Sequence, residues 1–313
     1  MDKIKIGTLV NRGMDSPAYI EEIRDHGFES YSLTFWQTTE GTDWQKLADE
    51  VAKACEPTGA IISSIGVFGN PMETNELDLA TLKGWEDAID NAHLFGTDIV
   101  AGFTGRVRGE PIHKSLERYA EIWNPLADRA GEKNIRIAFE NCDMGGDWKQ
   151  GDWNIAHNPM AWELMFETCD QPNLGLEWEP CHQLVSLMDP IPQLRTWTPR
   201  IFHVHGKDAT IHWDLVKSHG VHSQAPGAKE VEVNGKTIKM NLPAVVEHRT
   251  PGFGDTNWSD VITELRRHGF EGSIDIEGWH DPIYRGDLEM MGQVRALNYL
   301  KECRGGTFVP NPA

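Results

Sequence analysis

The stretch from residue 98 to residue 140 decides the fold, because it reads as one complete strand–helix–strand unit. It contains a short apolar run, DIVAGF at 98–103, a long periodic segment, SLERYAEIWNPLADRAGE at 115–132, and a second apolar run, IRIAFE at 135–140. Strands that are apolar on both faces are typical of a parallel sheet that is covered on both sides. This unit therefore predicts two parallel strands joined by a helix.

The same alternation continues in both directions along the chain. Further strand-like runs are expected at Ile4–Val10, Ser30–Phe35, Ala60–Val67, Leu174–Glu179, Ile201–His205 and Gly272–Glu277. Further helices are expected at Pro17–His26, Trp44–Cys55, Asp78–Leu94, Met160–Cys169 and Ser259–His268. Eight strand–helix repeats in 313 residues favour a single domain, 1–313, folded as a (β/α)8 TIM barrel. No Gly-x-Gly-x-x-Gly follows an early strand, which argues against a dinucleotide-binding sheet.

The stretch between His205 and Trp258 is longer than a barrel loop requires. It contains Asn234-Gly235 flanked by alternating residues, a pattern that predicts a β-hairpin. We expect residues 209–248 to form an insertion after the seventh strand, at the mouth of the barrel where active sites are built. Such an insertion is either a lid over the substrate or a contact with another subunit, with a plain surface hairpin as the alternative.

Charge and composition narrow the classes of partner. Lys and Arg number 29 against 48 Asp and Glu, a net charge of −19, which argues against nucleic acid or an anionic membrane as the main partner. No apolar run approaches the roughly 20 residues of a membrane span. The five cysteines are widely spaced and form no CxxC pair, so reduced thiols and a cytoplasmic location are expected.

Four of the last strand-like runs end in a carboxylate or an imidazole: Glu140, Glu179, His205 and Glu277. Because side chains alternate along a strand, each of the last three shares a face with the residue two positions earlier and lies roughly 7 Å nearer the C-terminal end. All four are therefore expected to converge on one rim, where three carboxylates would raise one another's pKa.

A divalent cation relieves that repulsion. Oxygen and nitrogen donors favour Mn²⁺ first, are compatible with Mg²⁺, Co²⁺ or Fe²⁺, and exclude an all-sulfur zinc site. The alternative for each residue alone is a buried, hydrogen-bonded structural group.

Five segments match motifs of one family when they are taken together. They are Leu116–Glu140, Asn173–His182, Phe202–Asp208, Arg249–Asp255 with Trp258, and Ser273–Glu277. In these segments the chain resembles the xylose-isomerase-like TIM barrels, often described as sugar phosphate isomerases/epimerases. The resemblance implies metal ligands at Glu140, Glu179, His205 and Glu277, and substrate-binding roles for His182 and Arg249. It also implies that Glu140 and Glu277 remove and return a proton beside a sugar carbonyl. Where Glu179 stands, the epimerases usually have Asp, one methylene shorter, which leaves the reaction open.

Other candidates come from their places near the predicted strand ends. His157 is a candidate acid or base, with a structural or helix-capping role as the alternative. Trp36 and Trp148 are candidates for stacking on a substrate, with core packing as the alternative. Lys207 is a substrate-binding candidate at the rim, expected to pair with Asp208 rather than to form a Schiff base.

The leading hypothesis is a metal-dependent isomerase or epimerase that acts on a small carbohydrate. The second is a C-glycoside deglycosidase catalytic subunit, a lyase of the same superfamily that expels the aglycone of a 3-oxo-glycoside and pairs with a small β-rich subunit. A homo-oligomer is also expected. Abasic-site endonuclease chemistry, which exists on the same barrel, is disfavoured by the net charge. A non-catalytic sugar-binding barrel is the remaining alternative.

Overall fold

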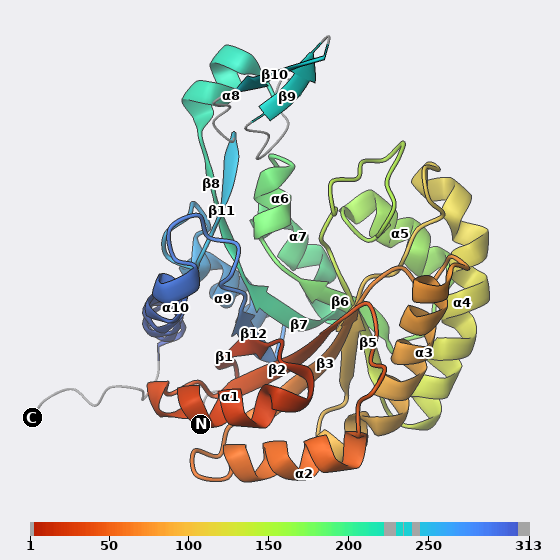
Figure 1. Ribbon diagram of the computed structural model, residues 1–313, viewed down its shortest axis with the longest axis vertical. Helices are drawn as coiled ribbons and strands as arrows, with labels where there is room; N and C mark the ends of the chain where they lie inside the picture. The colour runs from red at the N-terminus through yellow and green to blue at the C-terminus, as the bar shows by residue number, and fades with distance from the viewer. Residues whose placement is uncertain (1–2, 222–229, 234, 240–244, 306–313) are drawn as a thin grey trace, which may run out of the picture.

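The barrel closes through eight parallel strands. The computed structural model describes residues 3–221, 230–233, 235–239 and 245–305, with elements labelled as in Figure 1. The barrel strands are β1 (Lys5–Val10), β2 (Ser30–Trp36), β3 (Ile61–Phe68), β4 (Ile99–Gly102), β5 (Arg136–Glu140), β6 (Leu174–Trp178), β7 (Ile201–Gly206) and β12 (Ser273–Ile276). Their order around the barrel is β1-β12-β7-β6-β5-β4-β3-β2. All eight predicted strands and the (β/α)8 architecture are therefore confirmed.

The helices cover the outside of the barrel (Figure 1). They are α1 (Ser16–Ile23), α2 (Trp44–Cys55), α3 (Glu76–Asn91), α4 (Ile112–Glu132), α5 (Pro159–Thr168), α6 (Cys181–Val185), α7 (Pro190–Trp197), α9 (Trp258–Arg267) and α10 (Glu289–Arg304). The sequence analysis missed α6, α7 and α10. The first two are short, and the buried face of α10 includes the polar Gln293 and Arg304, which interrupts its apolar periodicity.

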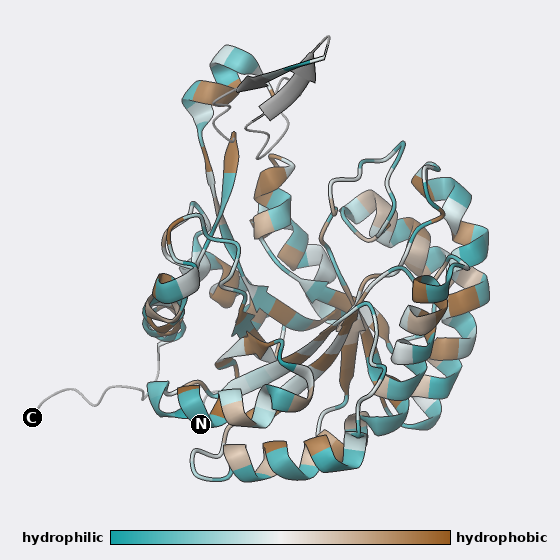
Figure 2. Ribbon diagram, in the orientation of Figure 1, coloured by the Kyte–Doolittle hydropathy of each residue, from teal (hydrophilic) through white to brown (hydrophobic). Residues whose placement is uncertain are grey.

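The core lies between the strands and the helices, where apolar residues of both layers meet (Figure 2). Several tryptophan side chains belong to this core. The fully buried ones are Trp85, Trp123, Trp162, Trp178 and Trp258. The Trp123 ring centroid lies 4.8 Å from that of Trp85 and 4.6 Å from that of Phe139 on β5. These edge-to-face contacts hold α3 and α4 against the strand that carries Glu140.

The predicted insertion is present after β7. Strand β8 (Asp208–Ile211) pairs antiparallel with β11 (Val246–Arg249), and α8 (Trp213–His219) follows β8. Strand β9 (Glu230–Val233) pairs with β10 (Lys236–Lys239), which confirms the predicted hairpin. Gly235 has a φ of 72° in its turn, whereas Asn234 lies outside the described residues. These elements project beyond the barrel (Figure 1).

The base of the insertion is packed against the barrel mouth. Cys181 and Leu184 of α6 form a small apolar cluster with Ala209 of β8. Asp208, at the start of β8, accepts hydrogen bonds from the backbone N–H of Gly252 and Thr256 and from the indole of Trp258. The base of the insertion and the loop that follows β11 are therefore held in place beside the strand ends.

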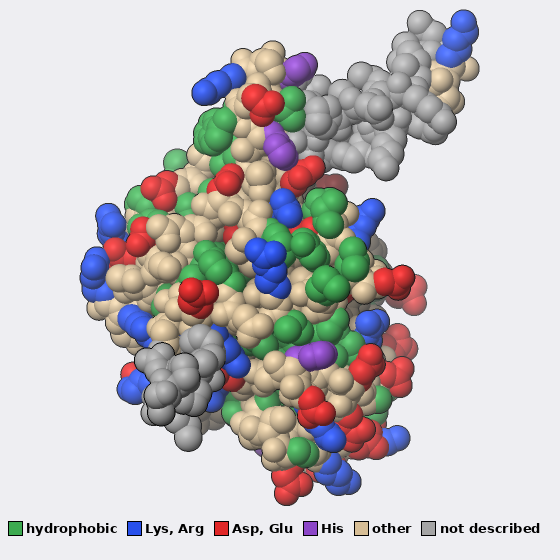
Figure 3. Space-filling view, turned by 90° about the vertical axis from the view of Figure 1, so that its left-hand side faces the viewer, with side chains coloured by type: hydrophobic (Ala, Val, Ile, Leu, Met, Phe, Trp, Pro, Cys, Tyr) green, Lys and Arg blue, Asp and Glu red, His purple; other side chains and the backbone are tan. Residues whose placement is uncertain are grey.

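Charged side chains are mixed over the surface. On the face shown in Figure 3, Lys and Arg side chains lie scattered among Asp and Glu side chains. Within the described ranges, no helix combines the length and apolarity needed to cross a membrane. All five cysteines are free.

Candidate functional site

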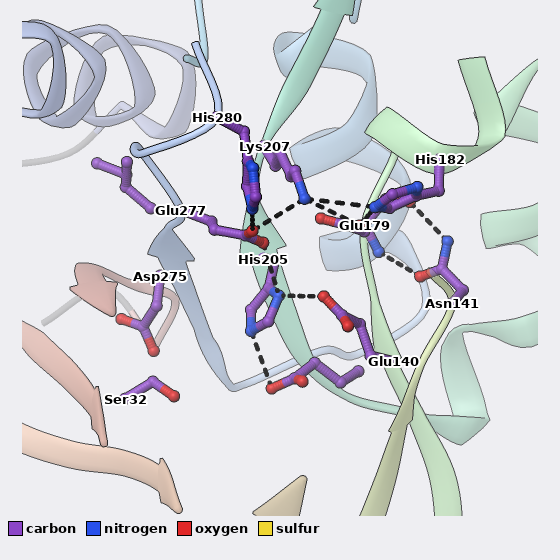
Figure 4. Close-up of polar contacts among 12 residues, drawn as sticks. Ser32, Glu140, Asn141, Glu179, His182, His205, Lys207, Asp275, Glu277 and His280 are labelled. Atoms are coloured by element: carbon purple, nitrogen blue, oxygen red, sulfur yellow. Dashed lines mark hydrogen bonds and ion pairs between the residues drawn. The ribbon is translucent and has the colours of Figure 1, made fainter. Parts of the chain in front are cut away.

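Four ionisable side chains meet at the C-terminal ends of neighbouring strands. Glu140 ends β5, Glu179 follows β6, His205 lies in β7 and Glu277 follows β12. All four are buried, and one possible ligand atom from each lies within 4.8 Å of the others. His205 Nδ1 is 3.0 Å from Glu140 Oε1 and 3.4 Å from Glu277 Oε2 (Figure 4). The structure thus brings together the four residues that the strand-end pattern selected, while their role as metal ligands stays a prediction.

A second ionisable layer lies deeper in the barrel, two residues earlier on three of these strands. It contains Glu177, His203 and Asp275. The imidazole of His203 bridges the two carboxylates, with Nδ1 2.7 Å from Glu177 Oε1 and Nε2 2.6 Å from Asp275 Oδ2. Burial alone would lower the pKa of His203, but these two hydrogen bonds raise it. The two layers follow directly from the alternation of side chains along a strand.

The deeper layer orients the upper one. His205 Nε2 lies 3.1 Å from Glu177 Oε1, while its Nδ1 faces Glu140 and Glu277. When the proton is on Nε2, next to the Glu177 carboxylate, the Nδ1 lone pair points at the carboxylate cluster. A carboxylate behind an imidazole is the usual arrangement for a histidine that binds a metal.

Burial and one ammonium group set the protonation of the cluster. Burial raises the pKa of both Glu140 and Glu179 to about 7. Glu277 is equally buried, but Lys207 and His205 hold its pKa well below the ordinary value. Lys207 Nζ lies 2.9 Å from Glu277 Oε1 and 3.8 Å from Glu179 Oε1, and these carboxylates raise its pKa despite burial.

The donor set fits a divalent cation. Oε2 of Glu179 and Oε2 of Glu277 are both buried without a hydrogen-bond partner. Leaving a buried carboxylate oxygen unsatisfied is costly, so such atoms point to a partner that is not a protein group. Three carboxylates and one imidazole would offer Mn²⁺ or a similar ion mainly oxygen ligands.

Two asparagines hold the strand ends in position. Asn141 accepts a hydrogen bond from the backbone N–H of Glu179 and donates one to its carbonyl, at 2.6 and 2.9 Å. Asn154 donates to the carbonyls of Glu140 and Cys142 at 2.8 and 2.7 Å. The sequence analysis assigned neither residue a role. Asn141 carried a signal, since it directly follows Glu140 at a strand end, but the position of Asn154 depends on how the following loop folds.

A cavity of about 710 Å³ opens above the cluster. Of the predicted substrate-binding residues, Trp36, His182 and Lys207 line it. His182 Nε2 is 2.7 Å from Glu179 Oε1 and 3.3 Å from Lys207 Nζ, and burial lowers the pKa of His182 to about 4. The predicted pairing of Lys207 with Asp208 is wrong. Lys207 points into the cluster, whereas Asp208 faces the backbone of the 252–256 loop.

Three predicted site residues are not among those that line this cavity: His157, Trp148 and Arg249. His157 is buried, with Nδ1 3.2 Å from the Asn158 amide, and burial lowers its pKa to about 4. Trp148 packs against the main core. Arg249 donates from Nε to Asp281 at 3.1 Å, so that contact is made away from the carboxylate cluster. Their chemical roles stay predictions.

Two further imidazoles line the cavity and were not predicted. His248 comes from β11 of the insertion, and His280 follows β12. The ring centroid of His248 lies 5.3 Å from that of His182 and 5.7 Å from that of His280. His280 Nε2 is 3.0 Å from Glu277 Oε1. His280 stands three residues after Glu277, a detectable signal, whereas His248 reaches the cavity only because β11 pairs with β8.

Known proteins share this architecture. The family model described as xylose isomerase-like TIM barrel matches residues 20–303. The uncharacterized protein YfiH of Bacillus subtilis is 24% identical over 255 residues, 73% of this chain and 74% of that protein. The inosose dehydratase of Clostridium tetani is 27% identical over 180 residues, 57% of this chain and 51% of that enzyme. The structure of the 3-keto-D-glucoside 4-epimerase YcjR of E. coli is 13% identical, covers 96% of this chain and 100% of its own, and superposes with a TM-score of 0.65.

Proposed function

Because the chain belongs to the xylose isomerase-like TIM barrel family, we propose that it is a metal-dependent enzyme that moves a proton at the carbon beside a sugar carbonyl. The observation that carries this proposal is the buried group of Glu140, Glu179, His205 and Glu277, whose ligand atoms lie within 4.8 Å at the end of the cavity. These four would hold one divalent cation, Mn²⁺ in the first instance.

The cation, when bound, would stabilise the negative charge that develops on the substrate oxygens. Glu140 and Glu277 project from different strands on either side of His205, which suits them to opposite faces of a bound sugar (Figure 4). Lys207, 2.9 Å from Glu277, favours the ionised form of that carboxylate, the form that accepts a proton. Glu140, on the other side of His205, would carry the proton to be returned.

The relatives support a reaction on a sugar or a cyclitol. The named activities among them are epimerisation of a keto-glucoside and dehydration of an inosose. Removal of a proton beside a carbonyl is a common first step of both kinds of reaction. Isomerase or epimerase chemistry is therefore the first candidate for this chain.

A lyase outcome is the second candidate, favoured by the inosose dehydratase match. In this reaction the same proton removal is followed by loss of a group from the next carbon. The C-glycoside deglycosidase type, with a small β-rich partner subunit, is one form of it. His280 Nε2 lies 3.0 Å from Glu277 Oε1, and His280 would be placed to protonate a leaving group.

The test is proton exchange in D2O with the Mn²⁺-loaded protein. D-Tagatose, D-fructose, an inosose and methyl 3-oxo-β-D-glucopyranoside are incubated separately and followed by NMR. Deuterium entering the carbon beside the carbonyl supports the proposal, and the product separates its two forms: a new epimer or isomer indicates the first, and loss of water or methanol the second. Absence of exchange in every substrate contradicts the proposal.

The two glutamates are tested by Glu140→Gln and Glu277→Gln, with Glu132→Gln on the exposed face of α4 as the control. Each site variant should lower the rate of product formation by roughly 10²- to 10⁴-fold. A variant that keeps one base should still exchange the proton on one face while failing to form the other epimer. If both variants retain the control's rate, the acid–base assignment is wrong.

A further inference from the structure

A second group of possible metal ligands lies beside the carboxylate cluster. It consists of Cys142 and Asp143, in the loop after β5, and His182 on α6, and we call it the thiol site. One ligand atom from each residue, a sulfur, an oxygen and a nitrogen, lies within 4.8 Å of the other two. All three residues line the cavity, and the proposed proton transfer uses neither Cys142 nor Asp143.

The imidazole of His182 leaves one nitrogen without a partner. His182 is 4% exposed, and its Nδ1 is buried with no hydrogen-bond partner among the described residues. Its Nε2 lies 2.7 Å from Glu179 Oε1 and 3.3 Å from Lys207 Nζ (Figure 4). A proton on Nδ1 would be buried and unsatisfied, which is costly. With the proton on Nε2, next to the Glu179 carboxylate, the Nδ1 lone pair is free to bind a metal.

This free nitrogen lies close to the other two residues. His182 Nδ1 is 4.0 Å from Asp143 Oδ1, and 20% of the Asp143 side chain is exposed. Ligand atoms around a tetrahedral zinc ion lie roughly 3.3–3.6 Å apart, because the Zn–N and Zn–O distances are about 2.0–2.1 Å and the Zn–S distance is about 2.3 Å. Shifts of roughly 1 Å in the side chains would therefore bring the three ligand atoms to the spacing of a zinc site.

Hydrogen bonds hold the two loop residues in place. Asn154 donates to the carbonyl of Cys142 at 2.7 Å. Asp143 Oδ1 accepts the backbone N–H of Gly145 at 2.9 Å. Groups that fix the orientation of a ligand strengthen metal binding, because less freedom is lost when the metal binds. The loop after β5 thus presents a thiol and a carboxylate that are already positioned beside His182.

The donor atoms of the thiol site differ from those of the carboxylate cluster. One thiolate, one imidazole and one carboxylate suit Zn²⁺ or Co²⁺, whereas three carboxylates and one imidazole suit Mn²⁺. Three protein ligands also leave a fourth position, which would face the cavity that all three residues line. Catalytic zinc sites keep such an open position, whereas structural zinc sites are closed.

We propose that Cys142, Asp143 and His182 form a second metal site, which takes a borderline-soft divalent cation of the zinc type. Binding forms a bond between the metal and the Cys142 sulfur, and the thiol proton passes to the solvent. Glu179 connects the two sites, since its Oε1 lies beside His182 Nε2 and its Oε2 is available to the first cation. The thiol site requires only its three ligands, so it does not depend on the proposed proton transfer.

The test is Co²⁺ binding to the full chain after a chelator has removed any bound metal. Cobalt bound by a thiolate has a sulfur-to-metal charge-transfer absorption in the near ultraviolet, which carboxylate and imidazole ligands do not give. We expect about two Co²⁺ ions per chain, one at each site, and a charge-transfer band that persists in excess Mn²⁺. Binding of cobalt without the band overturns the thiol site.

Variants identify the sulfur. Cys142→Ser should abolish the band and weaken binding of the second cation at least about 100-fold, beyond the loss typical of outer-shell changes. Cys55→Ser is the matched control, because Cys55 at the end of α2 is 7% exposed and Cys142 is 6% exposed. A band that survives in Cys142→Ser, or is lost in Cys55→Ser, contradicts the assignment.

The partly exposed Asp143 provides a variant that should not disturb folding. Asp143→Asn should keep the band and weaken binding of the second cation about 10-fold, because the neutral amide is a poorer ligand than the carboxylate. An unchanged affinity in this variant overturns the site whether or not Cys142→Ser folds.

The two metal proposals fail differently. A single cobalt ion that gives the band would keep the thiol site and remove the metal of the proposed function. A single ion that gives no band would do the reverse.

Discussion

The two halves of the barrel rim differ in chemistry although their backbones are alike. At the ends of strands β5, β6, β7 and β12, or one residue beyond, lie Glu140, Glu179, His205 and Glu277. At the ends of β2, β3 and β4, or one residue beyond, lie Trp36, Phe68 and Phe103. The same alternation of side chains thus delivers charge on one half and apolar surface on the other.

The ionisable half of the rim depends on the apolar half. Phe68 packs beside His205, and burial raises the pKa of Glu140 and Glu179 to about 7. A carboxylate in water would titrate near 4 and would seldom be protonated at neutral pH. The apolar half therefore contributes to these raised pKa values by keeping water away from the ionisable half.

The largest effect is expected from removing a ligand of the ionisable half. His205→Ala should lower Mn²⁺ affinity at least about a thousandfold, beyond the loss typical of outer-shell changes, because it deletes the nitrogen donor. His113→Ala, exposed on α4, is the matched control. The affinity is measured by calorimetry. An affinity within tenfold of the control would remove His205 from the site.

Next in size is the loss of the buried ammonium group. Lys207→Met should destabilise the metal-free protein by about 3 kcal/mol, because it leaves the carboxylates of Glu277 and Glu179 without their cation. Guanidinium unfolding measures the change, with the exposed Lys53→Met as the control. A difference below about 0.5 kcal/mol would show that the pair contributes nothing.

A smaller effect is expected from the deeper layer. Glu177→Gln should weaken Mn²⁺ binding about 10-fold, since the amide keeps the shape of the side chain beside His205 Nε2 but removes its charge. Trp36→Ala on the apolar half should leave Mn²⁺ affinity within about twofold. Equal losses in the two variants would contradict the division of the rim into two halves.

Stability of the metal-free protein should fall as pH rises from 6.5 to 8. With pKa values raised to about 7, Glu140 and Glu179 in the folded state keep protons that the unfolded chain has already lost. Together these two carboxyls would lower stability by about 1.5 kcal/mol as the pH rises over this window. The lowered pKa values of His182 and His248, about 4 and 3, partly oppose this fall up to about pH 7.5, because the imidazoles of the unfolded chain lose their protons near pH 6.5. Thermal melts with and without Mn²⁺ check this: the metal should restore stability most at pH 8, and a flat profile without metal contradicts the pKa shifts.

The smallest effect concerns the stability cost of the exposed indole. Trp36→Ala should change the free energy of unfolding by no more than about 0.5 kcal/mol, because half of the side chain is already in water. Trp123→Ala in the core should cost about 3 kcal/mol or more. A large loss for Trp36→Ala in denaturant unfolding would assign that indole to the core instead of the cavity.

Predictions from the sequence were correct where a feature depends on the pattern of neighbouring residues in the chain. The eight strands follow from short apolar runs, and the hairpin of the insertion follows from the Asn-Gly turn signal. The convergence of the four ionisable residues follows from the alternation of side chains along parallel strands. Reasoning from neighbouring positions failed for Lys207, which stands beside Asp208 in the chain but points to Glu277 on another strand. The position of Trp178 is a second example of this failure. It stands next to Glu179 in the chain, yet its side chain is buried in the core.

Local patterns were enough to predict the barrel and the residues at its strand ends, because each pattern spans only a few consecutive positions. The groups that surround those residues depend on how distant segments pack: His248 reaches the cavity through the pairing of β11 with β8, and Asn154 reaches the end of β5 through its loop. The same packing also sets the protonation of the carboxylate cluster and places Trp36, Phe68 and Phe103 together on the apolar half of the rim. Burial and contacts between distant segments arise only when the chain closes into a barrel, so no local pattern encodes them.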